Sequence, residues 1–290
     1  MMRNVIGKIG VVLLASLFVL TLFPGMSWAH PEKSHLVRIL ERGVLRVGSS
    51  GDYKPFSFIV PKTEAEKGRL AVAKTGSRLA AKKEDEVLIG FDVDAAKKLA
   101  EDLGVKVEFV PFEWRNLIAG LVADKYDIAM SGITIRLERA KSVHFSDPYI
   151  LIGSSPLVRK EDAKRFRSWQ DVDRPGVVVV VTLGTSNDQI VTKRFKHATI
   201  KRITAPASTV AELLAGRADA TITDNIAAVM QAQDHPELYA VNPRHPFEKD
   251  YFGYPVQQGD PDWLQFVNTW IRLNKQDGFF EELEQKWIAW

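Results

Sequence analysis

The pattern of apolar and polar positions alternates between two periods along most of the chain. Short apolar runs typical of strands alternate with stretches in which apolar residues recur every three or four positions, as on one face of a helix. The first such helix is predicted at 92–103, between strands at 44–48 and 105–110. A second amphipathic helix, at 114–122, precedes a buried strand at 128–132. This alternation predicts βαβ units and a mainly parallel sheet, which is an α/β fold.

A second set of alternating elements follows Tyr149. The apolar run 176–181 predicts a fully buried strand, and the turn 184–188 leads into a helix at 189–196. Further strands are predicted at 200–203 and 218–224, and further helices at 209–215 and before His235. The chain therefore holds two α/β modules in series. Ligands in open α/β sheets bind beyond the carboxyl ends of the strands, so two modules that face each other would enclose one cleft.

The last part of the chain is predicted to return to the first module. Helices at 263–275 and 279–290 carry large apolar residues that would pack against it. Two crossing strands, near 150–155 and 251–254, would then connect the modules as a hinge.

These elements give a discontinuous first lobe and a continuous second one. We expect the first lobe at 30–154 and 252–290, and the second at 155–251. The segment 61–87 is rich in Lys, Glu, Ala and Arg and has few large apolar residues. It is predicted to be a charged insertion in a loop of the first lobe, as a helix or a flap, with no chemistry to assign.

The first 29 residues have the features of a signal peptide. Basic residues up to Lys8 precede an apolar run at 10–23, and the small residues Ser27 and Ala29 fit a cleavage site after Ala29. The run is shorter than the ~20 residues that span a bilayer, although an uncleaved anchor is the alternative. We therefore expect an exported mature protein that is not embedded in a membrane.

Composition excludes several classes of site. The chain has no cysteine, which rules out a lipid-anchored cysteine, disulfides, cysteine–zinc sites and thiol nucleophiles. Its 39 Lys and Arg nearly balance 36 Asp and Glu, which argues against a nucleic-acid partner. The 6 histidines do not cluster and no serine nucleophile motif is present. We expect no metal and no cofactor.

The stretch 131–139 carries the strongest candidate site. An apolar run ends near Gly132 and Thr134, and Arg139 follows five residues later. Backbone amides, a hydroxyl and a guanidinium would surround one point, and the paired donors of Arg match the two oxygens of a carboxylate. The alternatives are a surface ion pair for Arg139 and an ordinary strand position for Thr134.

Side chains after the first strand could complete one wall of a cleft. Asp52 would attract an ammonium group or orient a hydroxyl, and Phe56 or Tyr53 would give an apolar surface. Trp114 is a further candidate for that surface. The alternatives are a turn-capping role for Asp52 and a core position for Trp114.

The second module contributes candidates at two strand ends. The turn 184–188, with Ser186, lies where a buried strand becomes a helix, and free backbone N–H groups at such a point bind anions. Simple helix capping by Ser186 or Asn187 is the alternative. Asp224 ends another buried strand and would pair with an α-amino group, or else cap the helix that begins near Asn225.

Together these blocks resemble the type 3 periplasmic solute-binding proteins of amino-acid ABC transporters. The resemblance covers nearly all of the expected mature chain and is strongest at 132–139 and 145–149. It implies a two-lobed periplasmic-binding-protein fold of type II, a ligand cleft between the lobes, a two-strand hinge, a periplasmic location and a membrane transporter as partner. It also implies that Arg139 and Thr134 hold a ligand carboxylate and that Asp224 holds its amino group.

A narrower resemblance is to periplasmic cyclohexadienyl dehydratases, carried by residues 51–57, 137–139 and 235–241. Those enzymes share the fold and convert prephenate or arogenate with loss of water and carbon dioxide, which requires a positioned acid. They carry a glutamate where this chain has Asp188. Asp188 would be the catalytic acid only if the protein is a dehydratase. Its side chain is one methylene shorter, and a displacement of ~1 Å can cost ~100-fold in rate.

We therefore expect a binding protein rather than an enzyme. It would capture a small amino acid or related carboxylate in the cleft for an ABC transporter. The alternative is a dehydratase that uses Asp188, and a third, weaker possibility is a sensor or accessory protein that uses the same cleft without a transporter.

Overall fold

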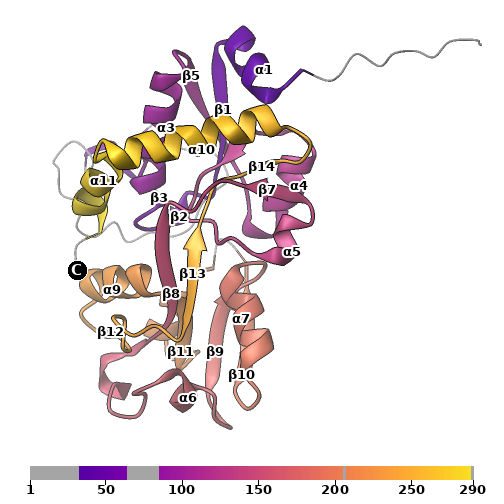
Figure 1. Cartoon of the computed structure of the whole chain (residues 1–290). Helices are drawn as coiled ribbons and strands as arrows, with labels where there is room; N and C mark the ends of the chain where they lie inside the picture. The colour runs from indigo at the N-terminus through magenta and orange to yellow at the C-terminus, as the bar shows by residue number, and fades with distance from the viewer. Residues whose placement is uncertain (1–32, 64–84, 205–206, 289–290) are drawn as a thin grey trace, which may run out of the picture. The chain divides into compact units, whose positions relative to one another are not determined.

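The computed structural model describes residues 33–63, 85–204 and 207–288 (Figure 1). The predicted signal peptide at 1–29 and the middle of the predicted insertion lie outside these residues. None of the described helices is long and apolar enough to cross a membrane.

The first sheet has the predicted parallel order. Its strands are β1 (Val44–Ser49), β5 (Lys106–Pro111) and β6 (Ile128–Ala129), with β1 in the middle. Helix α3 (Phe91–Asp102) precedes β5 and buries Ala96 and Leu99 completely, which agrees with the helical spacing of its apolar residues. The predicted helix at 114–122 is instead a 3-10 turn, η1 (Trp114–Asn116), followed by α4 (Leu117–Val122).

The second sheet is mixed rather than mainly parallel. Its path runs β10 (Thr199–Ile203), β9 (Val178–Thr182), β11 (Ala220–Asp224), β8 (Ile150–Arg159) and β12 (Leu238–Ala240). The first three strands are parallel, but β8 is antiparallel to its neighbours because it enters the sheet from the opposite end. The helices of this part of the chain are η2 (Lys160–Asp162), α6 (Trp169–Val172), α7 (Ser186–Arg194), α8 (Thr209–Leu214) and α9 (Asn225–Asp234).

The predicted hinge strands pair with each other. Strand β13 (Glu248–Phe252) runs antiparallel beside β8, from Ile150↔Phe252 to Ser154↔Glu248 (Figure 1). The loop that carries the strongest candidate site is attached to the same strand, because Ile135 N–H donates to the Tyr251 carbonyl at 2.9 Å. The short helix α5 (Leu137–Ala140) and the pair β7 (Val143–Phe145) and β14 (Pro255–Gln257) complete this region.

The C-terminal helices cover the first part of the chain. Helices α10 (Pro261–Gln276) and α11 (Phe279–Trp287) bury Trp263, Trp270 and Phe280, and α10 also contacts α1 (His35–Arg42). These are the packing surfaces that the apolar pattern predicts.

The predicted insertion begins and ends in a hairpin. Strands β2 (Asp52–Tyr53), β3 (Ser57–Pro61) and β4 (Glu86–Ile89) form a small antiparallel sheet. Pro61 pairs with Glu86, so both ends of the predicted segment 61–87 are strand residues. The predicted segment therefore overlaps the ends of β3 and β4, and its middle lies outside the described residues.

Candidate functional site

A cavity of about 100 Å³ lies among most of the candidate residues. It is lined by candidates from the first sheet's side, Asp52, Trp114, Gly132, Thr134 and Arg139, and by Ser186 from α7. The further lining residues are Tyr53, Thr182, Thr185, Asn187, Thr209, Thr221, Ile222, Thr223 and Gln231. Both halves of the fold contribute, as the two-module reasoning predicts.

Arg139 is a buried cation at this cavity. Its side chain donates to the carbonyl oxygens of Thr134 at 3.1 Å and Gly184 at 3.4 Å, and the residue is only 7% exposed. Among the described residues, no carboxylate lies within 4.0 Å of it, so it is not the surface ion pair of the alternative interpretation. Burial, helped by the neighbouring Arg136, lowers the pKa of the Arg139 guanidinium to about 10. A buried positive charge without an acid partner is suited to an anionic ligand.

Hydroxyl groups from the two halves meet beside Arg139. The Oγ1 atom of Thr134 lies 2.9 Å from the Oγ atom of Ser186. Thr185, rather than Ser186 or Asn187, caps α7 by accepting from the N–H of Asp188 at 3.2 Å. Ser186 therefore does not cap α7, and it lines the cavity.

Asp52 and Trp114 form a pair on another side of the cavity. The indole Nε1 of Trp114 donates to Asp52 Oδ1 at 3.1 Å. The ring of Tyr53 stands edge-on to Trp114, with ring centroids 5.6 Å apart. Burial raises the pKa of Asp52, although hydrogen bonds from Ser50 and Trp114 act in the opposite direction.

Asp224 lies behind the lining and contacts it through Tyr53. The Tyr53 hydroxyl donates to Asp224 Oδ2, and Asp224 also caps α9 by accepting from Ala227 N–H at 2.9 Å. Asp224 is 2% exposed, and burial raises its pKa. The pKa of Tyr53 is raised well above its usual value, by burial first and then by the Asp224 charge. The capping interpretation is thus confirmed, and the pairing of Asp224 with an amino group stays a prediction.

Like Asp224, two further candidates lie outside the lining. Phe56 is fully buried against Tyr53 and Phe252, with ring centroids at 5.4 and 4.9 Å, so Tyr53 takes the wall position that the sequence offered to either residue. Asp188 lines a second cavity, of about 350 Å³. Its Oδ1 accepts from Arg202 Nε at 2.7 Å and its Oδ2 from Gly184 N–H at 3.2 Å.

Apart from Thr134, sequence reasoning missed the threonines that line the cavity. Thr182 is the last residue of β9, and Thr223 is the last but one of β11. The rule that selected Asp224, namely that cleft residues follow the carboxyl ends of strands, applies equally to them.

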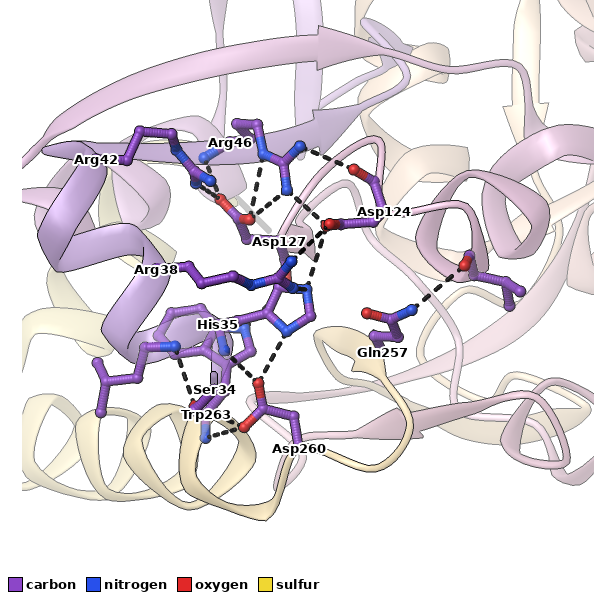
Figure 2. Close-up of polar contacts among 12 residues, drawn as sticks. Ser34, His35, Arg38, Arg42, Arg46, Asp124, Asp127, Gln257, Asp260 and Trp263 are labelled. Carbon is purple, nitrogen blue, oxygen red and sulfur yellow. Dashed lines mark hydrogen bonds and ion pairs between the residues drawn. The ribbon is translucent and has the colours of Figure 1, made fainter. Parts of the chain in front are cut away.

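Away from this cavity, one group in the described part of the chain has the composition of a metal site. Ligand atoms of His35, Asp124 and Asp127 lie within 4.8 Å of one another. Figure 2 shows that arginines of α1 and β1 already bind these carboxylates: Arg42 binds Asp127 at 2.5 Å, and Arg46 binds Asp124 at 2.6 Å. We interpret the group as an ion network that ties α1 to its neighbours.

Comparisons with known proteins agree with the fold described above. Residues 69–289 match the model of the bacterial extracellular solute-binding proteins, family 3. The cyclohexadienyl dehydratase of Pseudomonas aeruginosa is 36% identical over 89% of this chain and 88% of its own length.

Two solved structures of ancestral proteins are also similar. The ancestral amino acid-binding protein AncCDT-1, a precursor of cyclohexadienyl dehydratase, is 38% identical, with a TM-score of 0.75 over 88% of this chain and 100% of the other. The ancestral cyclohexadienyl dehydratase AncCDT-3 is 42% identical, with a TM-score of 0.51 over 89% and 98%.

Proposed function

This chain belongs to family 3 of the bacterial extracellular solute-binding proteins, and we propose that it captures an α-amino acid in the cavity beside Arg139 for delivery to an ABC transporter. We place the mature protein in the periplasm, after cleavage of the leader near Ala29. The lobes are 30–154 with 252–290, and 155–251, and the paired strands β8 and β13 form the hinge between them.

The buried guanidinium of Arg139 is the observation that carries this proposal. Its hydrogen-bond partners are carbonyl oxygens, and no carboxylate among the described residues forms an ion pair with it, although the Glu138 charge acts on it from a distance. A ligand carboxylate would supply the missing negative charge and accept paired hydrogen bonds, with Thr134 and Ser186 as neighbouring hydroxyl groups.

Two acids, the buried Asp224 and the partly buried Asp52, favour a ligand that also carries positive charge. Asp224 is the partner for an α-ammonium group, which would replace or join the Tyr53 hydroxyl. Asp52 would remain for a second positive group, at the indole N–H edge of Trp114 and near the ring of Tyr53, which stands edge-on to Trp114. Aromatic faces attract cations, so we propose a basic side chain on the preferred amino acid.

Dehydratase activity is the second candidate, because relatives of that activity are among the most similar proteins. It requires an acid next to the substrate. Both oxygens of Asp188 already accept hydrogen bonds from Arg202 and Gly184, and Asp188 is absent from the lining of the Arg139 cavity. Asp188 would have to exchange these partners before it could donate a proton to a ligand. This argument favours binding without turnover.

An absorbance assay with prephenate and with arogenate distinguishes binding without turnover from dehydratase activity. We expect no product from the wild-type protein or from Asp188→Ala. In equilibrium dialysis, we expect both proteins to bind an amino acid. Turnover by the wild type that Asp188→Ala abolishes would refute the proposal. Asp171→Ala, which removes an acid of α6 remote from the cavity lining, is the matched control.

A further inference from the structure

A buried carboxylate lies directly behind the cavity wall. Asp92, in the first turn of α3, is fully buried. It accepts hydrogen bonds from Gly132 N–H at 2.5 Å, from the Tyr149 hydroxyl at 2.9 Å and from the Tyr254 hydroxyl at 3.0 Å. Among the described residues, no lysine, arginine or histidine lies within ion-pair distance of it. All of its partners are neutral donors.

Those donors come from the loop that carries Gly132 and Thr134 and from residues that flank the two hinge strands. Gly132 lines the cavity, two residues before Thr134. Tyr149 immediately precedes β8, and Tyr254 follows β13. The two tyrosine rings are stacked, with centroids 4.3 Å apart. Asp92 is thus the common acceptor of three segments that are far apart in the sequence.

The position of Gly132 is constrained by its backbone conformation and by its neighbours. Gly132 has a φ of +61°, and a Cβ atom there would lie 2.5 Å from the Tyr53 ring. Gly253 N–H donates to the Ile133 carbonyl at 3.0 Å, which ties the same loop to the end of β13. A shift of the Gly132 amide would therefore move the loop, Tyr53 and the cavity wall together.

We propose that Asp92 is a positioning residue for ligand binding: its carboxylate fixes the loop 131–135, and hence Gly132 and Thr134, relative to the hinge strands β8 and β13. Asp92 itself touches no ligand. This role rests on the proposed function, because it concerns the wall of the same cavity.

The effect of the Asp92 charge on stability separates this positioning role from a purely structural one. Burial raises the pKa of Asp92 to about 7, although the bonds from Gly132, Tyr149 and Tyr254 act to lower it. The folded state then binds more protons than the unfolded state between about pH 4 and pH 7, so the Asp92 charge lowers stability as pH rises through that window. The nearby titratable groups are Tyr53, Tyr149 and Tyr254, which stay neutral there because their pKa values are raised well above the usual range.

Asp92→Asn is the central variant, since it removes the charge and keeps the volume. Asp94→Asn is its matched control: Asp94 lies in the same first turn but forms an outer ion pair with Lys286 at 2.8 Å. We expect Asp92→Asn to unfold at the same or a higher denaturant concentration than the wild type at pH 8. A structural role alone predicts the opposite.

Ligand affinity is measured by calorimetry with L-arginine between pH 6 and pH 8. A charge-assisted hydrogen bond is about twice as strong as a neutral one, so we expect wild-type affinity to fall about fivefold as Asp92 is protonated towards pH 6. Asp92→Asn should bind about fivefold more weakly than the wild type at pH 8 and show no such pH dependence. Asp94→Asn should behave like the wild type.

Amide NMR shifts test the same proposal without any ligand. The amide signals of Gly132 and Thr134 should titrate together near pH 7 in the wild type and not in Asp92→Asn. Tyr254→Phe should move the midpoint upwards, because the Tyr254 hydrogen bond lowers the pKa of Asp92. If no amino acid binds the wild type, the proposed function fails, and these titrations alone decide the role of Asp92. Amide signals that do not titrate, or an Asp92→Asn variant with wild-type affinity and pH profile, would overturn the inference.

Discussion

Replacing Arg139 by methionine should separate ligand binding from stability. Burial lowers the pKa of the Arg139 guanidinium well below its usual value, to about 10. One pKa unit corresponds to about 1.4 kcal/mol, so holding the charged guanidinium in the fold costs about 3 kcal/mol. Methionine removes this cost and fills a similar volume. It also leaves the carbonyl oxygens of Thr134 and Gly184 without their donor, at about 1–3 kcal/mol each. The burial cost that methionine removes therefore offsets much of the cost of the two unpaired carbonyl oxygens.

We therefore expect the free energy of unfolding of Arg139→Met to stay within about 3 kcal/mol of the wild-type value. Ligand affinity should behave differently, because removing one partner of a buried charge pair costs about 2–5 kcal/mol, which is about 30-fold or more in Kd. Urea unfolding followed by tryptophan fluorescence gives the first quantity, and calorimetry with L-arginine gives the second.

Arg115→Met is the matched control, since Arg115 is an exposed arginine near the same turn and pairs with Glu113 at 2.7 Å. It should change neither quantity. Retained affinity in Arg139→Met would refute the carboxylate clamp. A fall in affinity matched by an equal fall in unfolding free energy would refute the claim that Arg139 serves the ligand rather than the fold.

Two further substitutions test the cavity wall. Gly132→Ala places a Cβ atom 2.5 Å from the Tyr53 ring at a φ of +61°. We therefore expect the unfolding free energy to fall by about 2–4 kcal/mol, and ligand affinity to fall with it. A melting temperature equal to that of the wild type would contradict this. Tyr53→Phe removes the hydroxyl that donates to Asp224, so the unfolding free energy should fall by about 1–3 kcal/mol. Calorimetry should show undiminished affinity for an amino acid, because an ammonium group can donate to Asp224 in place of the hydroxyl. A loss of affinity as large as that of Arg139→Met would show that the phenol itself holds the ligand.

The periodic parts of the sequence were predictable because burial imposes their pattern. The alternation of strand and helix predicts the elements around β1, α3 and β5, and the strand-end rule brings Thr134 and Asp224 to the same region. The antiparallel course of β8 was not predictable, since a fully buried strand has the same apolar pattern in either direction.

The irregular parts of the site depend on contacts that no local pattern encodes. Tyr53 and Phe56 lie in one short turn, and nothing in their spacing tells which ring faces the cavity. The decision comes from Asp224, 171 positions away, which accepts the Tyr53 hydroxyl, whereas Phe56 has no polar group to satisfy and packs against Phe252. Likewise, Thr185 rather than Ser186 caps α7, and this shift of one residue leaves the Ser186 hydroxyl available to lie 2.9 Å from Thr134 Oγ1.

Titration calorimetry of the wild-type protein tests the central claim most directly, because it registers binding and turnover in one experiment. L-arginine, L-lysine, prephenate and arogenate would be injected in turn. We predict saturable binding of one basic amino acid per chain, with the heat signal returning to baseline after every injection of all four compounds. Absence of binding by both amino acids, together with sustained heat production from prephenate or arogenate, would contradict the account and indicate an enzyme.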